Sequence, residues 1–222
     1  MIKYYGTPLS PIKIFEEALT GKNVLIPFPR RDDFTRAVKL CNKIIIDNGA
    51  FSVWKKGISI DWNTYYNWID EVWDDISFFI IPDVIDGTES ENDQLIEDFF
   101  INHNKLKTKA VPVWHVDESL DRLLELATTF EYVAFGSSGK YATVGNKEWH
   151  IRMDEVMRFI CDDLGYPKVK IHMLRCLNQK VFTKYPFYSG DSTNLARNHK
   201  RDGWENIINR HHYFNSPRRY ER

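Results

Sequence analysis

The chain of 222 residues has few cysteines and no long apolar run. Its three cysteines, Cys41, Cys161 and Cys176, lie far apart and form no Cys-x-x-Cys pair. Neither a disulfide framework nor a cysteine-held zinc site is therefore expected, and a reducing compartment fits best. No apolar run approaches the ~18 residues of a membrane-spanning helix, and no charged-then-apolar leader opens the sequence. We expect a cytoplasmic protein with no membrane partner.

The sequence also lacks an excess of either charge, since its formal net charge is -1. A near-neutral chain has no global nucleic-acid footprint, but many enzymes that modify DNA or RNA are near neutral, so such a substrate is not excluded. Charge is uneven only in residues 199–222, which hold six Lys/Arg against three acids, together with three histidines. This basic C-terminal tail either contacts phosphate or is merely solvated, and the sequence does not separate the two.

No Pro/Gly/Ser-rich linker, repeat or break in composition divides the chain, so we expect a single domain over residues 1–222. Hydrophobic residues make up 43% of the sequence, which is enough for a sizeable core. Eight short segments are mostly apolar throughout, as strands buried on both faces of a parallel sheet are. These strand candidates are Ile2–Tyr5, Asn23–Pro27, Lys43–Asp47, Ser77–Ile81, Ala110–Trp114, Tyr132–Phe135, Val169–Met173 and Phe187–Gly190.

Amphipathic segments alternate with the strand candidates and are expected to form helices. They are Pro11–Thr20, Asp33–Cys41, Trp62–Asp74, Glu91–Asn104, Leu120–Phe130, Lys147–Leu164, Gln179–Tyr185 and Trp204–Tyr213. Eight strands that alternate with helices predict an α/β fold, in the first place a compact (β/α)8 TIM barrel with parallel strands. A doubly wound open sheet is the second possibility.

Two acidic turns follow strand candidates that lie far apart in the sequence. Asp47-Asn48-Gly49 follows the third candidate, and Asp191-Ser192 follows the last. In a barrel the carboxyl ends of the strands face one mouth, so residues there converge whatever their separation in sequence. A carboxylate at the end of a buried strand is costly to keep unless it has a task. Asp47 and Asp191 are therefore the first candidates for a nucleophile and a general acid/base.

Other strand ends carry further polar groups, each of which also has an ordinary structural interpretation. Asp83 could cap the next helix, and His115 and His172 could be satisfied core or rim histidines. Asp47-Asn48-Gly49 is also an ordinary turn signal. The glycine turn that begins at Gly136 could cradle a phosphate, but it is neither a Walker loop nor a dinucleotide fingerprint. No characteristic histidine spacing indicates a metal site, so no metal and no other cofactor is expected.

The ordered set of strand ends resembles the tRNA-guanine transglycosylases, including the phage and bacterial relatives that insert 7-deazaguanines into DNA. Those enzymes are TIM barrels with a catalytic Asp in an Asp-Ser-Gly-Gly-Phe turn, and this sequence has Asp47-Asn48-Gly49-Ala50-Phe51. Their nucleophilic Asp follows the last strand in a segment that ends in Ala-Arg, and here Asp191 is followed by Ala196-Arg197-Asn198. The segment His172-Met173-Leu174 is similar to the Tyr-Leu-Met-Gly segment of the preceding strand.

The resemblance spans roughly residues 43–198, and its departures bear on the substrate. Asn48 stands where the family usually has Ser, and Trp114-His115 stands where it has Gln-Gly, so base recognition is expected to differ. The Cys3His zinc subdomain that helps the tRNA enzymes hold tRNA has no counterpart, and the chain is far shorter than typical members. Both differences favour DNA over tRNA as the nucleic-acid partner.

The resemblance implies a base exchange without a cofactor. Asp191 would attack C1′ of a guanosine unit, and Asp47 would take a proton from the incoming 7-deazaguanine base. Asp83 would read the edge of the base and the Gly136 backbone would close over it, while phosphates would meet Arg175, Arg197 and the basic tail. The full substrate-binding set is Asp83, Asn48, Gly49, Phe51, His115, Gly136, Ser137, His172, Met173, Arg175 and Arg197.

Other functions stay open at the level of sequence. The same site could use water, which would make the protein a hydrolytic N-glycosylase or nucleoside hydrolase, or it could act on tRNA after all. A non-catalytic barrel that binds nucleic acid is a third alternative, and a homodimer or a partner subunit is compatible with each. A metal-dependent barrel hydrolase ranks last. A phage-encoded protein would act in the host cytoplasm.

Overall fold

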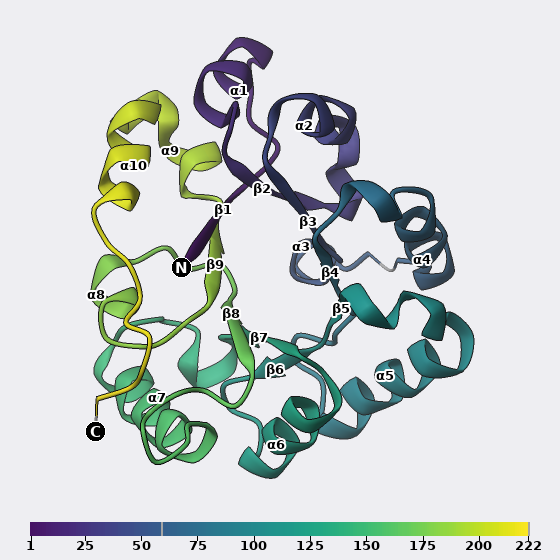
Figure 1. Ribbon diagram of the computed structural model, residues 1–222. Coiled ribbons are helices and arrows are strands. Elements are labelled where there is room, and N and C mark those ends of the chain that lie inside the picture. The colour runs from purple at the N-terminus through teal and green to yellow at the C-terminus, as the bar shows by residue number, and fades with distance from the viewer. Residues whose placement is uncertain (59, 222) are drawn as a thin grey trace.

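The strands of the protein form one curved parallel sheet. In the computed structural model, which describes residues 1–58 and 60–221, nine strands pair in the order β5-β4-β3-β2-β1-β9-β8-β7-β6. All of the pairs are parallel. The sheet bends into a nearly closed barrel with the helices around its outside (Figure 1). The predicted α/β barrel is confirmed, and the doubly wound open sheet is not observed.

Each predicted strand overlaps an observed one. The strands are β1 (Ile2–Gly6), β2 (Asn23–Pro27), β3 (Lys43–Asp47), β4 (Phe78–Ile80), β5 (Ala110–Val111), β6 (Val113–His115), β7 (Tyr132–Gly136), β8 (Lys170–Met173) and β9 (Ser189–Ser192). The last strand lies two residues beyond its predicted position, because its pairing with β1 continues to Tyr4 opposite Asp191 and Tyr5 opposite Ser192. Asp191 therefore lies within a strand and not in a turn after it.

The ninth strand arises from a break in the fifth predicted strand at Pro112. Proline has no N–H to donate to a strand ladder. β5 pairs with β4 and β6 pairs with β7, so the two edge strands of the sheet are joined through this single residue. The Pro112 carbonyl still accepts the N–H of Ala134 at 2.9 Å. The fifth predicted strand therefore corresponds to β5 and β6 together, and the eight predicted strands correspond to the nine observed ones.

The helices follow the predicted alternation, with two additions. The α-helices are α1 (Ile12–Leu19), α2 (Phe34–Leu40), α3 (Ala50–Trp54), α4 (Trp62–Glu71), α5 (Glu89–His103), α6 (Leu120–Thr129), α7 (Lys147–Ile160), α8 (Gln179–Phe182), α9 (Asn194–Asp202) and α10 (Trp204–His212). The short helices α3 and α9 were not predicted, and each begins three residues after one of the two candidate acids, Asp47 and Asp191. Helix α5 is capped by Thr88 and Glu91 in a capping box, so Asp83 is not its cap. Among the described residues, no helix is both long and apolar enough to cross a bilayer.

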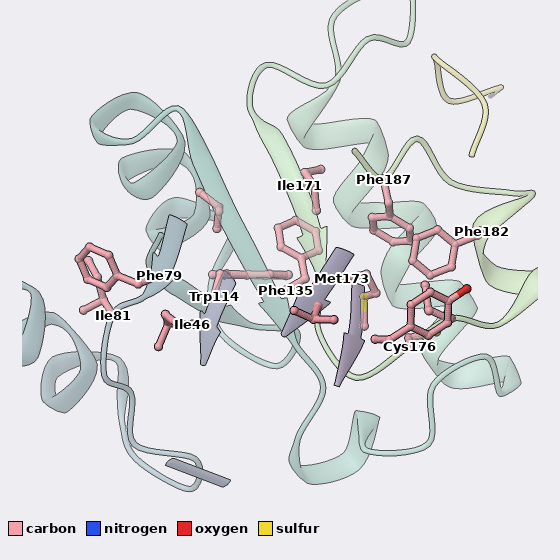
Figure 2. Close-up of a cluster of buried hydrophobic side chains, with 14 of the residues drawn as sticks. Ile46, Phe79, Ile81, Trp114, Phe135, Ile171, Met173, Cys176, Phe182 and Phe187 are labelled. Carbon is pink, nitrogen blue, oxygen red and sulfur yellow. The ribbon is translucent and has the colours of Figure 1, made fainter. Parts of the chain in front are cut away.

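Alternate side chains on the strands pack on opposite sides of the sheet. One apolar layer lies between the sheet and the helices, and Figure 2 shows part of it, including Phe135, Met173 and Phe187. A separate, smaller cluster holds the side chains that alternate with these and fills the barrel interior. Its buried members are Tyr4, Leu25, Ile45, Phe78, Ile80, Val111, Val113 and Ala134. Residues that continue this inner series at the strand ends face the mouth of the barrel.

The basic C-terminal segment is folded onto the barrel. Helix α10 packs against α1, and Ile207, His211 and Phe214 are buried. The Lys3 ammonium donates hydrogen bonds to the backbone carbonyls of His211 and Phe214, which joins the segment to β1. The merely solvated terminus considered from the sequence therefore does not describe residues 199–221. Not every basic side chain of this segment is buried by the packing, and that of Arg219 is exposed.

We expect Gly190→Ala to lower the free energy of unfolding by about 1–3 kcal/mol, because overpacking a filled core has this cost. A Cβ at Gly190 would lie 2.3 Å from the Phe182 ring and 3.0 Å from the Cys176 carbonyl oxygen. Urea denaturation followed by circular dichroism measures the change. Gly21→Ala is the control, since Gly21 has φ +71° but no atom within 4 Å of an added Cβ, and only about 1 kcal/mol of backbone cost is expected there. Equal losses in the two variants would contradict the packing argument.

Candidate active site

Three carboxylates lie near one another at the mouth of the barrel. Asp47 ends β3, Asp83 follows β4, and Asp191 lies in β9. Burial, and after it the charges of Asp191 and Asp83, raise the pKa of Asp47 to about 7, while the Gly49 N–H and the charge of Arg175 lower it. The raised pKa means that Asp47 carries a proton for about half of the time near neutral pH. The acids that the sequence separates by up to 144 positions thus act on one another.

The turn after β3 is held in place by its own side chains. The Gly49 N–H donates to Asp47 Oδ2 at 3.1 Å, and the Ala50 N–H donates to Asn48 Oδ1 at 2.7 Å. Gly49 has φ +79°, and a Cβ there would lie 2.4 Å from Pro29 Cδ. The turn that these hydrogen bonds stabilise therefore also fixes the position of the Asp47 carboxylate.

Two side chains fix the Asp83 carboxylate. Asn48 Nδ2 donates to Asp83 Oδ1 at 2.8 Å and to the Ile81 carbonyl at 2.8 Å. His115 Nε2 lies 3.0 Å from Asp83 Oδ2. Asn48 and His115 were both predicted to contact substrate, and here they hold Asp83. Each carboxylate oxygen of Asp83 keeps a second lone pair with which it can accept a hydrogen bond.

A buried chain of charges continues behind His115. Glu118 Oε1 lies 3.6 Å from His115 Nδ1, and Arg122 Nη1 donates to Glu118 Oε2 at 2.6 Å. Burial lowers the pKa of His115, but the hydrogen bond and charge of Asp83, followed by the charge of Glu118, bring it above the ordinary value. Gly136 allows this approach, since a Cβ there would lie 2.7 Å from His115 Cδ2. The sequence analysis missed Glu118 and Arg122, although they stand four residues apart as a helical ion pair does.

Asp191 is held by the backbone and by a buried histidine. The Arg175 N–H donates to Asp191 Oδ1 at 2.9 Å, and His172 Nε2 lies 3.2 Å from the same oxygen. His172 Nδ1 lies 2.5 Å from Ser189 Oγ, which in turn contacts the Tyr132 hydroxyl. These contacts join Tyr132, Ser189, His172 and Asp191 in one buried series, in which a proton on His172 Nε2 would be donated to the Asp191 carboxylate.

The series of Tyr132, Ser189 and His172 lies deep in the barrel interior. The rings of Tyr4, Phe78 and Tyr132 surround the imidazole of His172 with centroid distances of 5.5–6.3 Å. His172 is fully buried, so it does not reach the mouth, where it was predicted to contact substrate. Its contacts indicate a role in orienting Asp191. Strand alternation also turns Met173 into the outer layer, whereas Leu174 packs on the inner cluster.

The remaining predicted residues lie at the rim of the mouth. The Arg175 guanidinium carbon lies 3.5 Å from the centroid of the Phe51 ring, which links the end of β8 to α3 across the mouth. Arg175 has φ +56°, a left-handed conformation that is uncommon outside glycine. Ser137 Oγ accepts a hydrogen bond from Trp149 Nε1 at 3.0 Å, and Arg197 is exposed on α9. Within residues 1–58 and 60–221, no group of three or more His, Cys, Asp or Glu side chains is placed to hold a metal ion.

We expect Asp47→Asn to stabilise the protein at pH 8 and to have little effect at pH 4. The pKa of Asp47 is raised from 3.8 in the unfolded chain to about 7, so the folded state is destabilised progressively as the pH rises from about 4 to about 7, and the loss is complete above pH 7. Asparagine keeps the hydrogen bond to Gly49 without ionising. The gain at pH 8 is at most about 4 kcal/mol, the equivalent of three pKa units. Urea unfolding at both pH values measures it.

The exposed Asp86, in the turn that follows Asp83, provides the matched control. Asp86→Asn removes the same charge from the same end of the barrel, and its effect on unfolding should be the same at pH 4 and pH 8. A stability gain for Asp47→Asn that does not depend on pH would show that Asp47 has no raised pKa.

Comparison of the chain with protein-family models, with curated proteins and with solved structures gives no match. The resemblance to the transglycosylases therefore depends on the residues themselves and on their order along the strands. A function for this site has to account for three acids. Asp47 has a raised pKa, Asp191 is buried and oriented by the Arg175 N–H, and Asp83 is fixed by two side chains.

Proposed function

We propose that the protein is a base-exchange transglycosylase that replaces guanine by a 7-deazaguanine derivative in nucleic acid. The observation that carries the proposal is the contrast between Asp47 and Asp191. Asp47 has a pKa of about 7, which suits a group that gives and takes a proton near neutral pH. Asp191 is oriented by the Arg175 N–H and by His172, which suits a nucleophile that must approach one carbon atom.

In the first half of the reaction, a carboxylate oxygen of Asp191 forms a bond to C1′ of the nucleotide. The C1′–N9 bond breaks, and its electron pair leaves with the guanine. Protonated Asp47 gives its proton to the departing base, so that neutral guanine is released. The product of this half is a covalent glycosyl-enzyme, as in retaining glycoside hydrolysis.

In the second half, the 7-deazaguanine derivative enters the vacated position. Ionised Asp47 takes the proton from N9 of the new base, and N9 forms the bond to C1′. The bond from C1′ to the Asp191 oxygen breaks, which restores the carboxylate. Protons balance over the two halves, because Asp47 starts and ends the cycle protonated.

Base recognition falls to groups around the same mouth. Asp83 has a free lone pair on each oxygen for the N–H edge of a purine, and its position is fixed by Asn48 and His115. Phe51 presents an aromatic ring at the rim, covered by the Arg175 guanidinium. An entering base would displace or share that cation–π contact. A base in a duplex has to leave the stack before C1′ is reachable, so the substrate is flipped or single-stranded.

We propose DNA as the polymer and the cytoplasm as the place of action. Within these 222 residues no Cys-x-x-Cys pair resembles the zinc subdomain with which the tRNA enzymes hold tRNA, which favours DNA over tRNA. The mouth of one chain supplies all three acids, so the proposed reaction needs no residue from a second chain. A homodimer or a partner subunit is compatible with this assignment.

We expect Asp191→Asn to abolish the exchange of labelled guanine or 7-deazaguanine into guanine-containing DNA, with a loss of at least about 10³-fold, since removal of a nucleophile costs this much or more. Intact-protein mass spectrometry should detect a glycosyl adduct on the wild type and none on Asp191→Asn. Asp86→Asn, which removes an exposed acid near the same mouth, should exchange at the wild-type rate.

Parallel assays on tRNA and on DNA identify the polymer. Full exchange activity in Asp191→Asn would contradict the assignment of the nucleophile. Release of guanine from the polymer without incorporation of labelled base would instead identify a hydrolytic N-glycosylase that uses the same site.

A further inference from the structure

A cavity of about 530 Å³ lies beyond the ends of β8 and β9, and its lining begins at Ser192, the residue after Asp191. The loop after β8 contributes Arg175 and Asn178, the end of β9 and the start of α9 contribute Ser192 and Asn194, and α10 contributes Arg210 and His211. Arg175 connects the cavity to the site directly, because its N–H is hydrogen-bonded to Asp191. Whatever occupies the cavity therefore lies beside a group bound at Asp191.

The polar lining of the cavity consists of donors that suit an anion. Its polar lining residues include Arg175, Arg210, Asn178, Gln179, Ser192 and Asn194, and the guanidinium group of Arg175 is itself stacked on Phe51 at the mouth. No acidic side chain is among the described residues that line it. The nearest acidic partner of Arg210 is Asp202, at 3.4 Å, and Asp202 is shared with Arg201 at 2.7 Å. Arg210 thus keeps donors for a further partner.

A buried histidine in the lining has an unused ring nitrogen. His211 is 5% exposed, and its Nδ1 has no hydrogen-bond partner among the described residues. Burial, then the charges of Lys3 and Arg210, lower the pKa of His211 to about 4, so the ring is neutral at pH 7. A buried polar atom without a partner destabilises the folded protein. A ligand that brings an oxygen or a hydroxyl into the cavity offsets this cost.

The place of the cavity in the barrel points the same way. With β5 and β6 counted as one interrupted strand, β8 and β9 are the seventh and eighth strands. The loops after the seventh and eighth strands of (β/α)8 barrels are where phosphate groups are most often held. Arginine, with its fixed fork of donors, is well suited to phosphate oxygens.

We propose that this cavity binds a backbone phosphate of the nucleic acid whose reacting sugar lies over Asp191. The inference rests on the proposed function and adds the subsite that positions the polymer. In a nucleotide the 3′ phosphate is joined to ring atom C3′ through a single oxygen, so a sugar at Asp191 brings a phosphate close to the cavity that begins at Ser192. Arg210 supplies the charged contact to this phosphate.

The test compares Arg210→Gln with Arg219→Gln. Both variants remove one arginine charge from the same C-terminal segment, but Arg219 is exposed and does not line the cavity. The probes are inorganic phosphate, deoxyguanosine and a short single-stranded oligodeoxynucleotide with one guanine, titrated by calorimetry at several salt concentrations. We expect Arg210→Gln to bind the oligonucleotide and inorganic phosphate at least fivefold more weakly and deoxyguanosine unchanged. Its log–log salt slope should fall by about 0.7, the value of one phosphate contact to a single strand.

Arg219→Gln should change each affinity by less than twofold. Equal losses in both variants would show diffuse attraction to a basic segment and would overturn the proposal. A loss confined to inorganic phosphate would assign the cavity to a free phosphate and would overturn the assignment to the polymer. Base exchange by the wild type is scored separately, so binding as expected without exchange would reject only the transglycosylase, whereas exchange with unaltered phosphate binding in Arg210→Gln would reject only the cavity.

Discussion

The repulsion among three carboxylates at one end of a parallel barrel is the constraint on which the site depends. Asp47, Asp83 and Asp191 come from three different strand ends, and the geometry of the sheet brings them within range of one another's charge. Among the described residues the Asp47 carboxylate has one hydrogen-bond partner, the Gly49 N–H, whereas Asp83 and Asp191 each contact two polar groups. Burial, together with the charges of the other two acids, therefore raises the pKa of Asp47.

Each of the other two acids is fixed by a different network. Asp83 is held at the mouth by Asn48 and by His115, behind which Glu118 and Arg122 complete a buried series of charges. Asp191 contacts His172, which in turn contacts Ser189 in the barrel interior. These networks cost the fold buried polar groups in an otherwise apolar interior. The hydrogen bonds within the networks offset this cost in part, since Arg122 Nη2 has no partner among the described residues, and they also orient the acids.

The sequence was sufficient for the fold because its strands are short, apolar and separated by amphipathic segments. It also identified Asp47, Asp83 and Asp191, because charged residues at the ends of buried strands are visible in the sequence. It was less successful with side chains whose role depends on direction. Met173 was placed at the mouth, although the period of two that puts His172 inside sends Met173 outward.

Contacts between segments that lie far apart in the chain could not be predicted from the sequence. The pairing of His172 with Ser189 depends on the register between β8 and β9, and the stacking of Arg175 on Phe51 depends on closure of the whole barrel. The cavity beside Asp191 is similar, since it exists only because α10 folds back over the loop after β8. The segment that forms α10 reads as a basic tail in the sequence, and only its docking through Lys3 and His211 gives Arg210 a place at the site.

The central claim is that burial and the charges of its two acidic neighbours together raise the pKa of Asp47 to about 7. The most direct measurement is a titration of the Asp47 carboxyl carbon by ¹³C NMR between pH 3 and pH 9, in the wild type and in Asp191→Asn. The account predicts an apparent pKa of about 7 in the wild type and a clearly lower value once the charge of Asp191 is removed. A wild-type value near 4, unchanged in the variant, would contradict it.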